Sequence, residues 1–448
     1  MAALFLVRTA DPAAADAAIA GARAQFALHG FAGLAERTLP GWRLLHAPHI
    51  IGGPESLVEQ DDDLAAVAGT LTYDGLMGRP ALEALLRTAE LPSLDWSRLG
   101  GQFAALVRQG GRTFLLTDHF AMFQLFHDGE MTIFSTSLLS AVGALPRVSF
   151  DPQGVYEFAF NVAPIGDDTV FNELKTLGPD RIVELLPEGV GLHPAARPMP
   201  VAAPGMTLDE RLDRHKSRLA DAVRPYVRQF GDHVHCPLSG GLDSRLLLAA
   251  LRAEGCQPRV YVYGGPDDAD VRIARSIGAA LNFEVAWLDK EARELAPDQF
   301  PEQVERNFQQ YDGLPSFGEL FENGMNAEAR DARHAGGALS ASGANGEIYR
   351  NFFYLADRPT SADSVGRTFF ARYARGDVTE AFDERAFLGR IGGKIAASLG
   401  VADALERLPR LRVEQIYPRV RSRALSGREI SLEGRYGAYL MPFLDRDV

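Results

Sequence analysis

The residues best suited to chemistry lie in one short stretch that reads Ser-Gly-Gly-Leu-Asp-Ser-Arg. The residues that matter in it are Ser239, Gly240, Gly241, Asp243 and Ser244. The glycines allow a sharp turn that brings bare backbone N–H groups close to an anion. The serine hydroxyls can donate to phosphate oxygens, and the aspartate can hold a magnesium ion. A leucine-rich helix is expected to follow and to point its positive N-terminal end at the same place, so the stretch predicts a cradle for pyrophosphate.

Strands and helices must alternate around this turn to position it. Strands are expected at 233–238, 259–263 and 283–288, and helices at 242–253 and 267–281. This order predicts a parallel sheet, which binds ligands at the carboxyl ends of its strands. The turn lacks the lysine of a Walker loop. It resembles instead the PP-loop of ATP pyrophosphatases, which cleave ATP between the α and β phosphates. A glycine-rich turn without a ligand is the alternative interpretation.

The first part of the chain has short apolar runs separated by turn signals. Expected strands are 103–107, 113–118, 123–127 and 131–135, with hairpin turns at Gly110-Gly111 and Asp128-Gly129. Helices are expected at 11–28 and 151–161, with Asp11 and Asp151 as N-caps. The pattern predicts an antiparallel α+β domain over residues 1–193 and a proline-rich linker at 194–206. The capping box Thr207-Leu-Asp-Glu210 then opens a second domain, 207–448, in which segments 301–328 and 361–425 are expected to be mostly helical.

Composition narrows the class of protein. The chain has 448 residues, a net charge of −13 and only two cysteines, Cys236 and Cys256. Two cysteines exclude a disulfide framework and a four-cysteine zinc site, and fit a reducing cytoplasm. The negative charge argues against a nucleic-acid partner, and no apolar run is long enough to predict a membrane span. Lysine occurs only at positions 175, 216, 290 and 394, so a catalytic lysine has few candidates.

The order of motifs resembles asparagine synthetase-type proteins along nearly the whole chain. Residues 239–244 match the PP-loop, 342–347 (Ser-Gly-Ala-Asn-Gly-Glu) resemble the family's Ser-Gly-Glu-Gly-Gly-Asp loop, and 442–445 match its Pro-Phe-Leu-Asp segment. Segments 99–103, 117–120 and 134–137 follow the order of the family's glutamine amidotransferase domain. The resemblance implies an Ntn-hydrolase-like antiparallel sandwich, followed by an α/β PP-loop ATP pyrophosphatase domain with a helical extension.

The resemblance also implies a site. The ATP-binding residues it assigns are Leu238, Ser239, Gly240, Gly241, Asp243, Ser244, Val262, Tyr263, Gly264 and Gly343. Asp243 and Glu347 would hold Mg²⁺, and the catalytic residues would be Asp243, Glu347 and Tyr349.

Four departures from the family pattern bear on activity. Glutamine hydrolysis in the family needs a cysteine after the initiator methionine, where this chain has Ala2, and the family's Asn-Gly-Glu glutamine clamp is Ala68-Gly69-Thr70. Ala344 replaces a residue that acts as general base, with Tyr349 or Glu319 as substitutes. The chain also lacks the lysine that relatives carry after Pro-Phe-Leu-Asp. Either the chain is a shortened version of the family, or an arginine between 407 and 435 replaces the lysine, although an exposed helical face explains most of those charges.

The expected function is therefore an ATP-dependent, AMP-forming amide-bond ligase that adenylates a carboxylate and couples it to an amine or ammonia. It would work without glutamine hydrolysis, in the manner of β-lactam synthetases and lasso-peptide cyclases in natural product biosynthesis. The partners would be a small-molecule or peptide carboxylate and an amine, with a homodimer as an open option. A catalytically silent homologue that binds nucleotide or a partner is the main alternative. A PP-loop enzyme that modifies tRNA is a weaker one, because the chain lacks paired cysteines and a basic surface.

Overall fold

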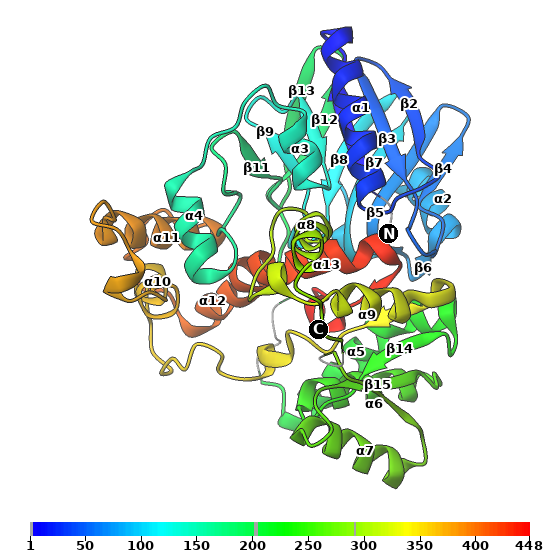
Figure 1. Cartoon of the computed structure of the whole chain (residues 1–448), viewed down its shortest axis with the longest axis vertical. Coiled ribbons are helices and arrows are strands. Elements are labelled where there is room, and N and C mark those ends of the chain that lie inside the picture. The colour runs from blue at the N-terminus through cyan, green and yellow to red at the C-terminus, as the bar shows by residue number, and fades with distance from the viewer. Residues whose placement is uncertain (1–2, 201–204, 291–292) are drawn as a thin grey trace.

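The computed structural model describes residues 3–200, 205–290 and 293–448. In these residues the chain forms two antiparallel sheets and one parallel sheet (Figure 1). The first sheet has the order β11-β9-β10-β1-β3-β2. Its strands are β1 (Ala3–Arg8), β2 (Ala35–Leu39), β3 (Trp42–Ala47), β9 (Phe126–Asp128), β10 (Ile133–Ser135) and β11 (Leu174–Thr176).

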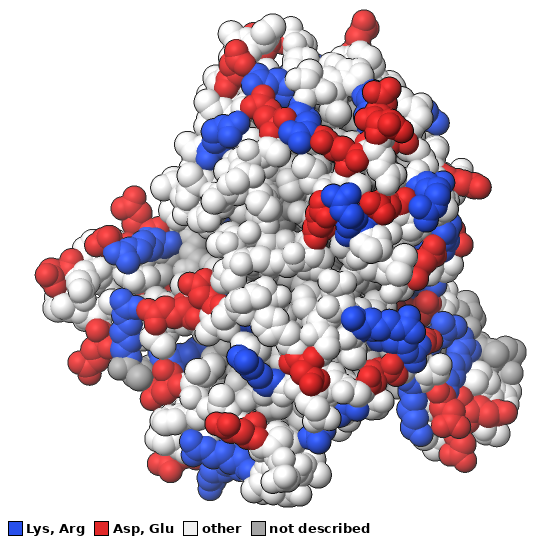
Figure 2. Space-filling model, turned by 90° about the vertical axis from the view of Figure 1, so that its right-hand side faces the viewer, with Lys and Arg blue, Asp and Glu red and all other residues white. Residues whose placement is uncertain are grey.

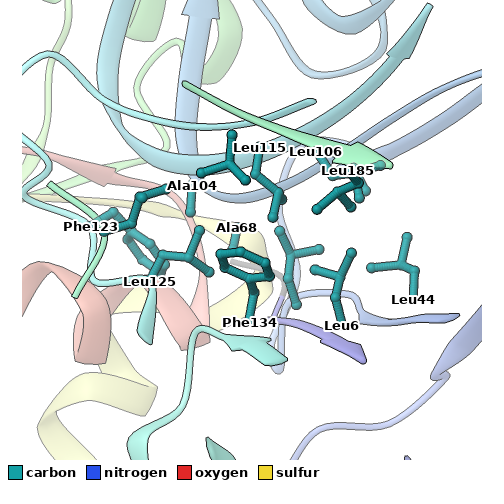
Figure 3. Packing of buried hydrophobic residues seen from close by; sticks show 14 of the residues in the cluster. Leu6, Leu44, Ala68, Ala104, Leu106, Leu115, Phe123, Leu125, Phe134 and Leu185 are labelled. Atoms are coloured by element: carbon teal, nitrogen blue, oxygen red, sulfur yellow. The ribbon is translucent and has the colours of Figure 1, made fainter. Parts of the chain in front are cut away.

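The second sheet has the order β13-β12-β8-β7-β5-β4, with β6 paired to β5. Its strands are β4 (Leu57–Gln60), β5 (Asp63–Tyr73), β6 (Leu76–Met77), β7 (Leu99–Gln109), β8 (Arg112–Thr117), β12 (Arg181–Leu186) and β13 (Gly189–Pro194). The two sheets pack face to face around a shared apolar core. Figure 3 shows Leu6 and Leu44 of the first sheet beside Ala68, Ala104 and Leu115 of the second.

Helices cover the outer faces of this sandwich. Helix α1 (Pro12–Leu28) packs on the first sheet and α2 (Gly78–Thr88) on the second. The Asp11 side chain caps α1 by accepting from the N–H groups of Ala13 and Ala14, and Asp151 caps α4 (Pro152–Asn161), so both predicted caps are confirmed. The expected strand at 123–127 is wrong for residues 123–125, and the strand begins only at Phe126. A short helix, α3 (Leu138–Gly143), completes this part.

The parallel sheet has the order β16-β15-β14-β17-β18, and all its pairings are parallel, as the sequence predicts. Its strands are β14 (Val234–Pro237), β15 (Arg259–Tyr263), β16 (Val285–Leu288), β17 (Leu339–Ala341) and β18 (Tyr439–Leu440). One face packs on α5 (Leu208–Phe230), α6 (Leu242–Ala253) and α7 (Ala269–Leu281). The Thr207 capping box that begins α5 is present.

The remaining helices lie between the sandwich and the parallel sheet, or beside them. They are α8 (Phe300–Gln310), α9 (Met325–His334), α10 (Ala362–Phe369), α11 (Glu384–Ser398), α12 (Arg410–Glu414) and α13 (Arg423–Tyr436). The expected helix over 301–328 is interrupted, because residues 311–318 form turns and irregular backbone. Short turns of 3-10 helix occur at Glu319–Phe321, Gly346–Tyr349 and Pro442–Leu444, and a π-helical turn at Tyr417–Ser422 leads into α13.

Helix α13 runs between the sandwich and the parallel sheet (Figure 1). Its residue Ile430 belongs to the same buried cluster as Leu6 and Ala104 of the sandwich. The predicted linker is also anchored, because the buried Arg197 side chain donates to the carbonyl of Thr117 and lies over the ring of Trp96. Residues 201–204 of that linker lie outside the described part of the chain.

The surface carries charges of both signs. Figure 2 shows lysine and arginine side chains interspersed with aspartate and glutamate over the face in view. Among the described residues, no helix is both long and apolar enough to cross a membrane.

Candidate functional site

The 239–245 segment lies at the carboxyl end of β14; residues 239–241 form a turn, and Asp243 and Ser244 lie in the first turn of α6. Ser244 is nearly buried and closes the turn, because its Oγ accepts from the N–H of Ser239 at 3.0 Å and lies 3.0 Å from Ser239 Oγ. Gly241 is the N-cap of α6, and no side chain caps this helix end. The predicted strand–turn–helix is therefore present, with two serine hydroxyls beside a helix N-terminus that favours negative charge.

The backbone N–H groups of this turn are not bare, contrary to the sequence-based expectation. The N–H of Gly240 donates to Asp270 Oδ1 at 2.9 Å, and the N–H of Gly241 donates to Ser239 Oγ at 3.1 Å. A Cβ at position 240 would lie 2.7 Å from Ile273 Cδ1 and 3.0 Å from Asp270 Oδ1, so side chains of α7 lie close to this turn. An anion at this turn would have to replace the Asp270 carboxylate.

The 342–347 loop packs directly on the N-terminal turn of α6. A Cβ at Gly343 would lie 2.9 Å from the backbone N of Ser244, and one at Gly346 would lie 2.3 Å from Asp243 Cγ. Asn345 lies between these glycines with a left-handed backbone (φ 70°) and a buried side chain that accepts from Ser426 Oγ at 3.0 Å. The fold thus brings together two motifs that are 100 residues apart in sequence.

Asp243 and Glu347, the predicted metal ligands, each have a protein partner. Asp243 pairs with Arg350 at 3.2 Å, and Glu347 accepts from the hydroxyl of Tyr417 at 2.8 Å. Among the described residues no group of three or more His, Cys, Asp or Glu is arranged to hold a metal ion. Protein sites for Mg²⁺ commonly supply only one or two carboxylates, with phosphate oxygens and water completing the shell. The donor set therefore fits magnesium that arrives with a nucleotide, and does not fit an all-protein metal cage.

The three positions considered for a general base differ in their surroundings. Ala344 is exposed and has no ionisable group. Burial, together with the nearby Asp243 carboxylate, raises the pKa of Tyr349 well above its ordinary value, which makes its hydroxyl a poor base. Glu319 is paired with Arg428 at 2.8 Å and accepts from the N–H of Ser316. Glu347, by contrast, accepts from a neutral group, the hydroxyl of Tyr417.

The predicted ATP-binding residues Leu238, Val262 and Tyr263 divide between the two faces of the parallel sheet. Val262 is buried in the core under α6, as is Leu238. Tyr263 faces the other way, accepts from Arg333 and has Lys290 Nζ 4.0 Å from its ring centroid. Gly264 has a φ of +138°, and its carbonyl accepts from Trp287 Nε1 at 2.8 Å.

Two cavities flank the 342–347 loop. The larger, of about 580 Å³, we call the Tyr417 cavity. It is lined by Glu347, Tyr349, Arg350 and Tyr417, by Phe443 of the C-terminal segment, and by Phe120 of the sandwich. The smaller, of about 300 Å³, we call the Arg330 cavity; it lies beside Tyr263 and Ser342.

Most of the arginines between 407 and 435 are half-buried or buried, and Arg407 is the exposed one, so the expectation of an exposed helical face is wrong. Arg423, Arg428 and Arg435 are buried and pair with Asp167, Glu319 and Asp312 at 2.8, 2.8 and 2.7 Å. Alternating arginine and glutamate is typical of a solvated helix, whereas Arg423, Arg428 and Arg435 each pair with a carboxylate from another segment. The charge pattern alone does not distinguish the two cases.

Residues 68–70, where the family pattern has a glutamine clamp, are covered by other segments of the chain. Thr70 is buried in β5, and its hydroxyl accepts from the backbone N–H of Tyr439 at 3.0 Å. Gly69 has a φ of +108°, and a Cβ there would lie 2.3 Å from the carbonyl oxygen of Gln102. Ala2, the position of the missing nucleophile, lies outside the described residues.

Comparisons with known proteins do not assign the chain to a family. No protein-family model and no curated protein matches the chain. One similar solved structure is the allosteric regulatory enzyme of purine biosynthesis, with 10% identity, 64% of this chain and 80% of that chain covered, and a TM-score of 0.29. Another is the glutamine phosphoribosylpyrophosphate amidotransferase from B. subtilis, with 10% identity, 68% and 70% covered, and a TM-score of 0.28.

Proposed function

We propose that the chain is an ATP-dependent, AMP-forming amide-bond ligase that uses a free amine or ammonia and does not hydrolyse glutamine. The observation that carries this proposal is the packing of the 342–347 loop on the N-terminus of α6, at the carboxyl edge of a parallel sheet. This edge is where open α/β sheets bind ligands. The sandwich and the second part would then be an Ntn-hydrolase-like domain and a PP-loop domain of the asparagine synthetase type.

In this reaction a carboxylate oxygen of the substrate bonds to the α-phosphorus of ATP, and the bond from that phosphorus to the β-bridging oxygen breaks. Pyrophosphate leaves with the electron pair. The amine nitrogen then bonds to the acyl carbon, AMP leaves, and a base takes the amine proton. The Ser239 and Ser244 hydroxyls and the end of α6 would hold the phosphates, while Asp243 and Glu347 would hold the magnesium.

The Tyr417 cavity is the place where the substrate would meet the nucleotide. It adjoins Asp243 through Arg350, which lines the cavity and pairs with that carboxylate. Glu347 also lines this cavity, where it accepts from the hydroxyl of Tyr417, so the magnesium would lie at the edge of the substrate pocket. Phe120 contributes to the wall, so the sandwich would help to shape the substrate pocket.

Pyrophosphate exchange into ATP, measured with a panel of carboxylic acids, tests the proposal directly. Exchange is expected in the wild-type protein and should be lost in Asp243→Ala. Asp221→Asn, an exposed carboxylate on α5, is the matched control and should retain exchange. Wild-type protein that binds ATP but shows no exchange with any acid would refute the ligase and favour a silent homologue.

A second variant, Asp270→Ala, distinguishes an active ligase from a silent homologue. The silent homologue is favoured by one observation, the Asp270 carboxylate on the N–H of Gly240. Removing that carboxylate should free the N–H and tighten ATP binding several-fold, whichever function is correct. Exchange that appears only in Asp270→Ala would show that this contact silences the native site. Release of ammonia from glutamine above background would contradict the assignment of a silent first domain.

A further inference from the structure

The Tyr417 cavity has an aromatic wall that the adenylation reaction alone does not require. Tyr349 lies edge to face against Phe443, with the ring centroids 5.5 Å apart. Phe352 lies edge to face against Tyr417, with the centroids 4.7 Å apart. Small-molecule sites are lined mainly by apolar and aromatic side chains and have volumes of about 300–1,000 Å³. At about 580 Å³, the Tyr417 cavity has the size and the walls of such a site.

Part of this apolar wall remains accessible to a ligand. Leu411 of α12 lines the cavity and is 69% exposed, and Tyr349 lines it and is 38% exposed. Removing apolar surface from water is favourable, and each buried methylene tightens binding about fourfold. A ligand that covers Leu411 and the ring of Tyr349 would gain affinity in this way.

The charged side chains of the lining offer little to a second charged group on the ligand. They are Glu347, Arg350, Arg410, Glu414, Asp445 and Arg446. Counting these side chains alone, 3 − 3 leaves no net charge. Arg410 pairs with Glu414, and Arg446 pairs with Asp447 at 2.8 Å. A charged ligand body would lose its water and would have to compete with these ion pairs, so the lining favours an uncharged body.

Arg350 differs from the other two arginines in its accessibility. Its side chain is 64% exposed, against 22% for Arg410 and 17% for Arg446. Its Nη2 donates to Asp243 Oδ2 at 3.2 Å, and a guanidinium carries further N–H donors on its other nitrogens. These donors can bind a carboxylate in the cavity, and they would hold it next to Asp243.

We propose that the Tyr417 cavity binds a monocarboxylic acid with an uncharged apolar body, aromatic or aliphatic. Its carboxylate accepts from Arg350, and its body lies against Leu411 and Tyr349. The role of this acid as the substrate rests on the proposed ligase function, whereas its binding does not. The inference makes dicarboxylates poor ligands of the cavity, because their second carboxylate would lie against an uncharged wall.

Calorimetric titration of the full chain with acetate, hexanoate, phenylacetate and glutarate, at constant ionic strength and without nucleotide, tests this site. Hexanoate should bind about 15-fold more tightly than acetate or better, which corresponds to the burial of two methylenes. Phenylacetate should also bind more tightly than acetate. Glutarate should bind about tenfold more weakly than hexanoate, because its second carboxylate replaces apolar contact.

Two variants locate the two ends of the acid. Leu411→Asn should weaken hexanoate binding about fourfold or more and leave acetate binding unchanged. Leu405→Asn is the matched control, because Leu405 is 66% exposed and lies outside the lining, and it should bind as the wild type does. Arg350→Gln should weaken all the acids about tenfold or more, because each of them carries the carboxylate. All three side chains are largely exposed, so these variants should unfold at the wild-type temperature.

The outcomes separate this inference from the ligase proposal. Equal affinity for hexanoate and glutarate, or wild-type hexanoate affinity in Leu411→Asn or in Arg350→Gln, would overturn the inference. Exchange of pyrophosphate into ATP with glutarate and not with hexanoate would also overturn it, and would leave the ligase standing. Binding in the expected order without exchange would support the site and count against the ligase.

Discussion

A substitution at Gly346 tests most directly how the 342–347 loop packs on the N-terminus of α6. In Gly346→Ala the added Cβ would lie 2.3 Å from Asp243 Cγ and 2.6 Å from Asp243 Cβ. Carbon atoms pack at about 3.5–4.0 Å, so the loop and α6 would have to separate by about 1 Å or more. Overpacking of this kind typically costs about 1–3 kcal/mol. We expect a lower free energy of unfolding in urea and weaker ATP binding, because Asp243 is displaced.

The control for this variant is Gly389→Ala. Position 389 lies inside α11, where a Cβ would meet nothing within 4 Å. Alanine there should stabilise the helix by about 0.5–1 kcal/mol and leave ATP binding unchanged. If Gly346→Ala keeps both the stability and the ATP affinity of the wild type, the loop does not pack on α6 as described. The structural basis of the proposed function would then be lost.

Three further predictions concern stability. Glu433→Gln should destabilise the protein by about 3–5 kcal/mol in urea unfolding, because it leaves buried arginines without their carboxylate, whereas Glu302→Gln on the exposed face of α8 should change little. Thr207→Ala should cost about 0.5–2 kcal/mol by removing the cap of α5, measured the same way. The Arg112 guanidinium lowers the pKa of Glu184 from 4.5 to about 2, so the stability this pair provides is complete above pH 4.5 and is lost as the pH falls towards 2. Glu184→Gln should flatten that part of the stability–pH curve, and an unchanged curve would contradict the assignment.

Much of the fold follows from local patterns in the sequence. Alternating apolar segments and glycine turns predict β14, α6, β15 and α7, and the caps Asp11 and Thr207 place their helices correctly. These signals are local, because a cap or a turn depends on residues a few positions apart. The strand order of the sheets depends on distant pairings, and no short pattern specifies it.

The site shows the same division between local and distant information. The 239–245 turn is visible in the sequence, but the carboxylate on the N–H of Gly240 comes from Asp270, 30 residues away. In the sequence Lys290 is distinguished only by the rarity of lysine, yet in the structure it lies over the ring of Tyr263. The pairing of Tyr417 with Glu347 spans 70 residues and has no sequence signature. Residues of this kind become visible only once the fold brings them together.

The sandwich has a structural role that does not depend on glutamine chemistry. Its strand β5 accepts the N–H of Tyr439 through Thr70, and the N–H groups of Ile50 and Ile51 donate to the last turn of α13. Asp312, from the second part, accepts from Ser137 and the N–H of Leu138 at the start of α3 and also pairs with Arg435. These contacts tie α13 and β18, the last strand of the parallel sheet, to the sandwich. Because Glu433 of α13 in turn holds Arg330 and Arg333, removing the sandwich would disturb the second part even if the first part has no reaction of its own.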